Sequence, residues 1–271
     1  MNIIVCIKQV PDTTEIRIDP VKHTLIRAGV PSILNPFDGY ALEAAARLKD
    51  KNPDTNIYVL SMGPNQAMAV LREAMSMAAD KAYLVSGRSF GGSDTLATSY
   101  IISQAIKKIE RQEGIKFDAI FCGKQAIDGD TAQVGPEIAE HLGLPQVTYG
   151  LECEKTDTGK LLVLQEGDGY KAKVVVDFPC LVTFTKPNFD PRFPTVKRKL
   201  AAKKAEIKII TDSEEDFPDM DRAKIGLKGS PTRVKTTFTP EPKQGGIVYQ
   251  KEAPEVMVKK LVGEMHKSGL I

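Results

Sequence analysis

The chain has 271 residues, 42% of them hydrophobic, which is enough to bury the core of a large domain. Its 37 lysines and arginines against 35 aspartates and glutamates leave a formal charge of +2, so no whole-molecule field favours a nucleic-acid partner. No apolar run reaches the roughly 20 residues needed to cross a bilayer, and residues 1–12 lack the basic region and cleavage site of a signal peptide. We therefore expect a globular protein with no nucleic-acid partner and no membrane anchor.

Short apolar runs bounded by Gly, Pro, Asp or Ser predict buried parallel strands at residues 2–8, 57–61, 82–86 and 119–122. Segments with helical period alternate with these strands, at residues 36–50, 65–78, 93–112 and 131–142. A small hairpin, residues 14–18 with 24–26, is expected after the first strand. The alternation predicts an α/β fold, a Rossmann-like parallel sheet with helices on both faces.

The second half of the chain predicts additions to this sheet. Residues 161–166 and 170–176 are extended runs joined by Gly-Asp-Gly, a strong signal for a flanking β-hairpin, and residues 180–185 form a further strand. After residue 211 the composition shifts to turn and linker residues. Only residues 254–267 carry an apolar helical stripe there, and so short an amphipathic helix is expected to dock on this domain or on another subunit.

Cysteine and histidine usage excludes some chemistry. The four cysteines show no CxxC spacing and mostly sit in apolar runs, where a free thiol behaves as a small hydrophobic side chain. They are Cys6, Cys122, Cys153 and Cys180. The three histidines are far apart and have no neighbouring Cys or acidic ligand pattern, so we expect neither a metal site nor a histidine-based hydrolase. A reducing, cytoplasmic setting suits the free thiols best.

Residues 117–136 are the most informative stretch, because an apolar strand there leads into a loop of small and polar residues and then into a helix. Small residues let backbone approach a ligand, and the next helix offers free N–H groups to phosphate. The alternative is an ordinary turn, with Thr131 as N-cap and Pro136 in the first turns. Neither GxGxxG after the first strand nor GxxxxGK[ST] is present, so a nucleotide would not be held by either of these motifs.

Five stretches, in the same order along the chain, closely resemble the beta subunits of electron-transfer flavoproteins. They are IVCIKQVPD at the amino end, NPFDGYALEAAARLK from Asn35, SMGP from Ser61, GKQAIDGDTAQVGP from Gly123 and DPRFPTVKRKLAAKKAEI from Asp190. The resemblance covers residues 1–210 and does not depend on one motif. It implies a nucleotide-binding α/β domain over 1–210, followed by a linker and C-terminal arm over 211–271.

The resemblance also implies which residues meet the nucleotide, while no side chain is expected to act as a catalytic acid or base. The implied binding residues are Cys6, Asn35, Pro36, Phe37, Asp38, Met62, Gly63, Gly123, Lys124, Gln125, Ala126, Ile127, Asp128, Gly129, Asp130, Thr131, Ala132, Gln133 and Val134. Asn35 and Pro36 equally fit a helix cap and first helical position. Two carboxylates would repel a phosphate, so Asp128 and Asp130 are expected to brace the loop instead.

Residues 90–100, FGGSDTLATSY, look like those of the electron-bifurcating branch, whose beta subunit holds FAD in place of AMP. In that interpretation Asp94, Thr95 and Thr98 lie near the diphosphate or flavin, and NADH is the electron donor. The alternative interpretation is a helix cap by Ser93 and Asp94 in a non-bifurcating subunit that holds AMP as a structural ligand.

The resemblance finally implies partners. An alpha subunit carrying a second FAD would complete the heterodimer, and ferredoxin or flavodoxin would take one electron. Residues 186–204 match the loop that docks a dehydrogenase, of the acyl-CoA or the lactate type, with Val196 as apolar anchor and Arg192 and Phe193 beside it. The family commonly has Leu at the position of Val196.

Overall fold

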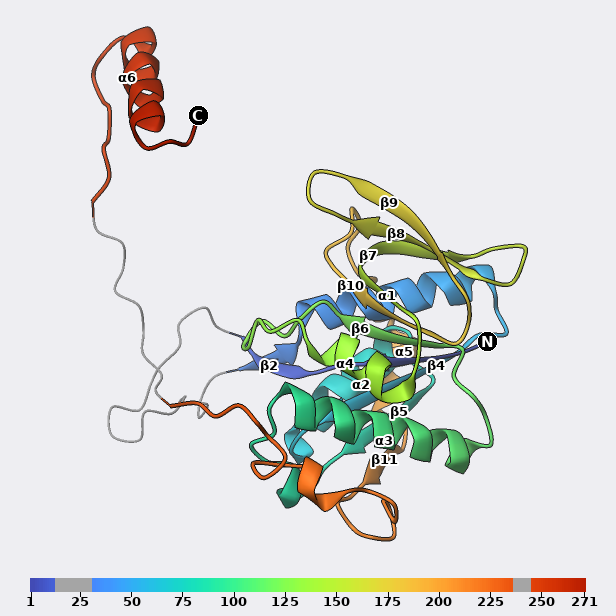
Figure 1. Cartoon of the computed structure of the whole chain (residues 1–271). Helices are drawn as coiled ribbons and strands as arrows, with labels where there is room; N and C mark the ends of the chain where they lie inside the picture. The colour runs from blue at the N-terminus through green and yellow to red at the C-terminus, as the bar shows by residue number, and fades with distance from the viewer. Residues whose placement is uncertain (13–30, 236–244) are drawn as a thin grey trace. The chain divides into compact units, whose positions relative to one another are not determined.

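The computed structural model describes residues 1–12, 31–235 and 245–271 (Figure 1). Residues 1–12 and 31–235 belong to one compact unit and residues 245–271 to a second. The hairpin expected at residues 14–18 and 24–26 lies outside the described residues. Within the described parts no helix is both long and apolar enough to cross a membrane.

A nine-stranded sheet forms the centre of the first unit. In spatial order its strands are β11 (Ile207–Ile210), β5 (Lys81–Val85), β4 (Asn56–Met62), β1 (Asn2–Cys6), β6 (Ala119–Gly123), β10 (Cys180–Phe184), β7 (Gln146–Lys155), β8 (Leu161–Glu166) and β9 (Lys171–Val176). All neighbours pair in parallel except β7–β8 and β8–β9, which are antiparallel. The predicted parallel sheet and flanking hairpin are confirmed, whereas β7 and β11 were not expected.

Helices cover both faces of the sheet, as predicted (Figure 1). One face carries α1 (Pro36–Lys51), α2 (Met68–Met77) and α5 (Val196–Lys204), and the other carries α3 (Thr95–Glu113) and α4 (Val134–Leu142). Strand β1 shows why both faces are apolar, because Ile3 and Val5 join the first core and Ile4 joins the second. A two-stranded antiparallel sheet, β2 (Gln9–Pro11) with β3 (Ser32–Leu34), stands apart.

The segment after β11, which the sequence groups with the C-terminal arm, packs on the sheet unit as far as residue 235. Phe217, Met220 and Ile225 are buried in the core under α3, and the Phe217 ring meets Phe90 edge to face with centroids 6.0 Å apart. Three single 3-10 turns interrupt the described chain, η1 (Asn65–Ala67), η2 (Arg88–Phe90) and η3 (Arg222–Lys224). In the second unit, helix α6 (Pro254–Lys267) exposes the apolar stripe expected of it.

The segment before α4 and the predicted docking loop differ most from the predictions. Helix α4 begins at Val134, not at Thr131, because Asp130 and Ala132 have positive φ angles of 51° and 52°, which a right-handed helix cannot include. The expected N-cap role of Thr131 is therefore wrong, and Gln133 occupies the cap position without a side-chain bond. The predicted docking loop 186–204 is helical from Val196, with Thr195 Oγ1 accepting a hydrogen bond from Arg198 N.

Candidate nucleotide site

The carboxyl ends of β1, β4 and β6 and the starts of α1, α3 and α4 gather at one edge of the sheet. Strand β1 lies between β4 and β6, and the chain continues from β1 through α1 to one side and later returns to β6 on the other. This is a topological switch point, the place where open α/β sheets bind ligands. The predicted residues on different elements therefore share one edge.

Asp38, a buried residue in the first turn of α1, links the strands at this edge. Its carboxylate oxygens accept hydrogen bonds from the backbone N–H groups of Lys8, at 2.7 Å, and Gly123, at 3.2 Å. Burial raises the pKa of Asp38 to about 7, against the lowering effect of hydrogen bonds from Asn35, Lys8 and Gly123 and of the Lys8 charge. Asp38 thus joins β1, β6 and α1, and its carboxylate oxygens bind backbone groups of the protein and not a ligand.

Gly123 has no room for a side chain, because the end of β6 lies against the start of α1. A Cβ at this position would lie 2.3 Å from Asp38 Oδ1 and 2.7 Å from both Asp38 N and Phe37 C. Only a residue without Cβ lets the end of β6 approach the start of α1 this closely. The close approach expected here is real, but the neighbour is helix α1.

Asn35 holds the loop 123–134, which we call the nucleotide loop, against α1. It stands at the N-cap position with Pro36 as first helical residue, as predicted, but its side chain makes no capping bond. Its Nδ2 donates to Gln125 O at 2.8 Å, and its Oδ1 accepts from Ile127 N at 3.2 Å. Asn35 is fully buried, so these bonds exchange water for backbone of the loop.

Both loop aspartates have partners inside the protein, in agreement with a bracing role. Asp128 Oδ1 lies 2.7 Å from Lys8 Nζ, and Asp130 Oδ1 accepts from Gln125 Nε2 at 2.6 Å. A turn with Gly129 N and Asp130 N donating to Ala126 O closes the loop. Gly129 does not have a positive φ, and nothing lies within 4 Å of a Cβ built there. Gly129 therefore shows no need for conformational freedom, since Asp130 and Ala132 adopt the left-handed conformation instead.

The end of the nucleotide loop meets the start of α3. Thr95 Oγ1 lies 3.1 Å from Gln133 Oε1 and 3.2 Å from Glu137 Oε1, which brings the first turns of α3 and α4 together. A hydroxyl has one proton, so it can serve only one of these acceptors at a time. Glu137 Oε2 is buried without a partner among the described residues. Nor do the backbone N–H groups of residues 131–135 find an acceptor there.

The other predicted residues have structural contacts of their own. Gly63 N donates to Val85 O, Lys124 N donates to Phe184 O, and Thr98 N donates to Asp94 O. Phe37 packs edge to face on Tyr40, and Met62 is half-buried in the core under α3. Val134 begins α4. These residues line or support the edge, but the polar site itself is made by the starts of α1, α3 and α4 and by the nucleotide loop.

Cys6 and Cys122 are register neighbours at the ends of β1 and β6. A hydrogen bond with Cys6, together with burial, raises the pKa of the Cys122 thiol well above its usual value. Cys122 therefore stays protonated and packs as a small hydrophobic side chain, in line with the expectation for these cysteines. In the part of the chain that the structure describes, no group of three or more His, Cys, Asp or Glu residues is arranged to hold a metal ion.

Sequence reasoning missed a segment that meets Asp94. Asp94 caps α3, as one interpretation expected, with Oδ1 accepting from Ala97 N at 3.0 Å. Its Oδ2 accepts from Thr232 N at 3.0 Å and from Thr232 Oγ1 at 2.7 Å, and its N–H donates to Ser230 Oγ at 2.9 Å. The sequence signals only turn residues around Ser230, because nothing local pairs it with a residue 136 positions earlier.

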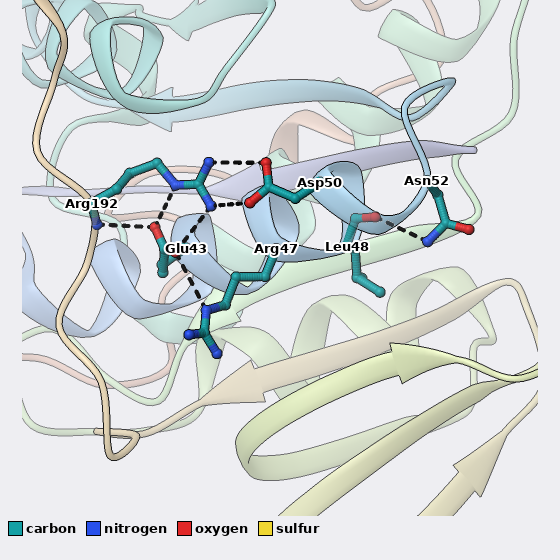
Figure 2. Close-up of polar contacts among 6 residues, drawn as sticks. All are labelled: Glu43, Arg47, Leu48, Asp50, Asn52 and Arg192. Atoms are coloured by element: carbon teal, nitrogen blue, oxygen red, sulfur yellow. Dashed lines mark hydrogen bonds and ion pairs between the residues drawn. The ribbon is translucent and has the colours of Figure 1, made fainter.

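Arg192, expected beside the docking anchor, is held by α1 instead (Figure 2). Its backbone N and Nε donate to Glu43 Oε2 at 3.0 and 2.8 Å, and its guanidinium also reaches Asp50 at 2.7 Å. Hydrogen bonds to Glu43 and Asp50 raise the pKa of Arg192 above its usual range. Phe193 and Val196 point outward, with 91% and 78% of their surface exposed, and Leu200 one turn later is 60% exposed.

A cavity of about 500 Å³ opens between α1 and the β7–β8 hairpin, away from this edge. Arg47, Cys153, Leu164 and Phe189 are among its lining residues, and none of the predicted nucleotide-binding residues is. Its walls mix charged side chains of both signs with apolar side chains, and it lacks the unpaired backbone N–H groups found at residues 131–135. The sheet edge at the carboxyl ends of β1, β4 and β6, which we call the nucleotide edge, therefore remains the candidate site.

Comparison with known proteins identifies the family of the chain. Residues 22–215 match the model of the electron transfer flavoprotein domain family. The chain is 54% identical to the electron transfer flavoprotein subunit beta of Megasphaera elsdenii over 253 residues, covering 93% of this chain and 92% of that one. It is 44% identical over its whole length to the whole of the caffeyl-CoA reductase-Etf complex subunit CarD of Acetobacterium woodii.

A third relative is protein FixA of Azotobacter vinelandii, 44% identical over 245 residues, which cover 90% of this chain and 85% of that protein. The matched family domain, residues 22–215, spans most of the candidate nucleotide site and all of residues 186–204. The chain belongs to the electron-transfer flavoprotein beta-subunit family.

Proposed function

We propose that this chain is the beta subunit of an electron-bifurcating flavoprotein, and that it holds FAD at the carboxyl ends of β1 and β6. In this proposal NADH reduces that FAD. One electron then goes to ferredoxin or flavodoxin, and the other passes through the FAD of an alpha subunit to a dehydrogenase. A bound isoalloxazine supplies this chemistry, because it accepts a hydride and can release the two electrons separately.

The observation that supports FAD most directly is the meeting of two helix starts. The first turns of α3 and α4 contact each other through Thr95, Gln133 and Glu137. Each start has a positive dipole end, and N–H groups of residues 131–135 are free of protein acceptors among the described residues. A diphosphate can use both starts, whereas the single phosphate of AMP needs only one. The resemblance of residues 90–100 to the bifurcating branch supports the same choice.

The protein's own residues would orient the cofactor and would exchange no proton with it. Glu137 Oε2, a buried acceptor without a donor, suits a ligand hydroxyl. Asp38, Asp128 and Asp130 have their carboxylates bound to the protein, which keeps these negative charges directed away from a phosphate. These features support the binding of a phosphorylated, hydroxyl-bearing ligand at this edge.

Residues 186–204, which we call the docking segment, and the names of the relatives support the proposed partners. The exposed side chains of Phe193, Val196 and Leu200 form an apolar ridge suited to a partner's groove. The name of CarD assigns that relative to a complex with a reductase of a CoA ester. For this chain we accordingly favour an acyl-CoA dehydrogenase as partner, with a lactate-type dehydrogenase as the other candidate. The free thiols suit a reducing cytoplasm.

Nucleotide analysis of the purified alpha–beta complex tests the proposal. Denaturation followed by chromatography should release two FAD per heterodimer. Release of one FAD and one AMP would overturn the bifurcating assignment and favour the AMP alternative. Thr95→Val should deplete the beta-subunit nucleotide and leave the alpha-subunit FAD, whereas Thr158→Val, in the turn between β7 and β8, should change neither.

A further inference from the structure

Residues 225–232, which we call the strap, lie against the loop that leads into α3. Ser93 Oγ accepts a hydrogen bond from Gly226 N at 3.1 Å and donates to Phe90 O at 2.8 Å. Ser230 Oγ accepts from Asp94 N at 2.9 Å and donates to Gly226 O at 2.7 Å. Ile225 is buried in the core under α3. The strap is therefore a fixed part of the first unit and not a passing linker.

Two glycines let the backbones touch. Gly226 has a φ of +60°, and a Cβ there would lie 2.2 Å from Ser89 O. Gly92, on the opposing loop, has a φ of +74°, and its Cβ would lie 2.7 Å from Leu227 Cγ. Both positions need glycine for conformation and for space. The strap and the loop thus fit in one arrangement, with little freedom to slide.

The strap decides which groups Asp94 can bind. An N-cap carboxylate can accept from several N–H groups of the first turn. Here Thr232 occupies Oδ2 through both its N–H and its hydroxyl, so only Oδ1 faces the helix, where it meets Ala97 N. Burial acts to raise the pKa of Asp94, but the hydrogen bonds from Ala97 and Thr232 outweigh it and hold the pKa below its usual value. Asp94 stays ionised and fixed.

We propose that Ser230 and Thr232 are positioning residues of the nucleotide site, which hold Asp94 so that the N–H groups of Thr95 and Leu96 stay open to phosphate. Without Thr232, the carboxylate is free to turn toward those N–H groups and to compete with the ligand for them. The strap thereby belongs to the proposed cofactor site, although Ser230 lies 136 residues from Asp94 in the sequence. This inference rests on the proposed binding of a nucleotide at the edge.

The test compares Thr232→Val with Thr232→Ser in the alpha–beta complex. Val keeps the shape and the N–H but removes the hydroxyl, whereas Ser keeps the hydroxyl. Thr232→Val should raise the dissociation constant of the beta-subunit nucleotide about tenfold, because it removes roughly one hydrogen bond to a charged group. Thr232→Ser should keep the wild-type dissociation constant. Binding would be measured by equilibrium dialysis with FAD and with AMP.

Thr211 offers a matched control in the same unit. Its N–H and hydroxyl both donate to Asp216 Oδ2, each at 2.6 Å, so Thr211→Val removes an equivalent bond far from the edge in sequence. Thr211→Val should leave nucleotide affinity unchanged. Equal loss of affinity in the Thr211 and Thr232 variants would mean that the strap acts only through stability, which would overturn the proposal.

Hydrogen exchange of the wild-type complex gives a second readout if Thr232→Val fails to assemble. Removal of the nucleotide should speed exchange in peptides covering residues 225–235, because the ligand and the strap support the same helix start. Unchanged exchange there would overturn the inference. A wild-type complex that holds no nucleotide in the beta subunit would overturn the proposed function, whereas wild-type affinity in Thr232→Val combined with depletion in Thr95→Val would overturn the inference alone.

Discussion

The nucleotide loop (123–134) and the docking segment (186–204) are both connections that leave the sheet, yet they are held in opposite ways. The nucleotide loop is held by polar contacts with Lys8 and Asn35 and by the aspartates of its own turn. The docking segment is fastened by the ion pairs of Arg192 and leaves Phe193 and Val196 in solvent. If the proposed nucleotide site is correct, the contacts that already hold the first connection lower the ordering cost of binding a small ligand. The second leaves apolar surface exposed, which the proposed partner would bury.

The largest test of the close packing at the nucleotide edge is Gly123→Ala. The added Cβ would meet backbone of α1 and Asp38 Oδ1 at 2.3 to 2.7 Å, and backbone cannot move aside cheaply. We expect a loss of about 3 kcal/mol in the free energy of unfolding, at the upper end for overpacking. Urea denaturation of the variant would measure it. Gly129→Ala is the matched control and should stay within about 0.5 kcal/mol, since its Cβ meets open space.

If Gly123→Ala and Gly129→Ala proved equally stable, the close packing of β6 on α1 would not require a glycine at position 123. The comparison between the two connections would then lose its basis, because the nucleotide loop would tolerate side chains at its root as an ordinary surface turn does.

The next test concerns the tie of the docking segment. Arg192→Ala leaves Glu43, whose side chain is 6% exposed, with a buried charge; among the described residues its remaining ion-pair partner is Arg47, with Nε 3.6 Å away. We expect a loss of about 2 kcal/mol in the free energy of unfolding, the usual cost of orphaning a buried charged acceptor. Lys51→Ala removes an exposed ion pair with Glu154 and should cost at most about 0.5 kcal/mol.

Thermal and urea unfolding of the Arg192 and Lys51 variants would give both numbers. Equal stability would show that the Arg192 cluster is a surface contact, and the docking segment would then be held mainly by its own helix α5, which packs on α2. The double variant Arg192→Ala with Glu43→Gln should recover part of the loss, because it removes the buried charge as well.

The third test addresses the exposed ridge. Val196→Asp should weaken binding of the partner dehydrogenase by at least ~2 kcal/mol, the scale of a hot-spot anchor, while NADH still reduces the flavin. Leu200→Asp should act in the same direction, since Leu200 lies one helical turn along the same face. Val175→Asp, an exposed valine on β9, serves as control. Titration with the purified dehydrogenase would measure the effect, and wild-type affinity in both ridge variants would assign this segment to a solvated basic surface.

Sequence reasoning reached the fold because the features that determine it are local. The apolar runs of β1, β4, β5 and β6 and the helical periods between them are visible in short windows. It also anticipated that Asp128 and Asp130 brace the loop, since like charges near a phosphate would repel it. The site residues were collected by resemblance, and the resemblance does not say which of them serve a ligand and which serve the protein.

The features that sequence could not supply are contacts between distant residues or backbone angles. The positive φ angles fall on Asp130 and Ala132, although Gly129 lies beside them, because the bonds of Gln125 and Lys8 fix the turn. The pairing of Asp94 with Thr232 spans 138 residues. Gly123 is needed for the close packing of α1, which no local pattern announces. Each of these depends on the assembled sheet.

The smallest test is the pH dependence that Asp38 gives to the nucleotide edge. The pKa of Asp38 rises from 3.8 to about 7 on folding, so between these values the folded state binds more protons than the unfolded chain. Its contribution to the free energy of unfolding is therefore largest below pH 4 and is lost as the pH rises toward 7. One proton allows at most ~1.4 kcal/mol per pH unit, and we expect about 1 kcal/mol per unit in this window. Urea unfolding at half-unit steps from pH 5 to pH 7.5 would measure the slope.

Asp38→Asn should unfold more easily overall, because its amide cannot accept both backbone N–H groups, yet its slope should be shallower. Parallel pH curves for the wild type and Asp38→Asn would mean that Asp38 titrates as it does in the unfolded chain, and that the strands at the edge are linked by an ordinary carboxylate.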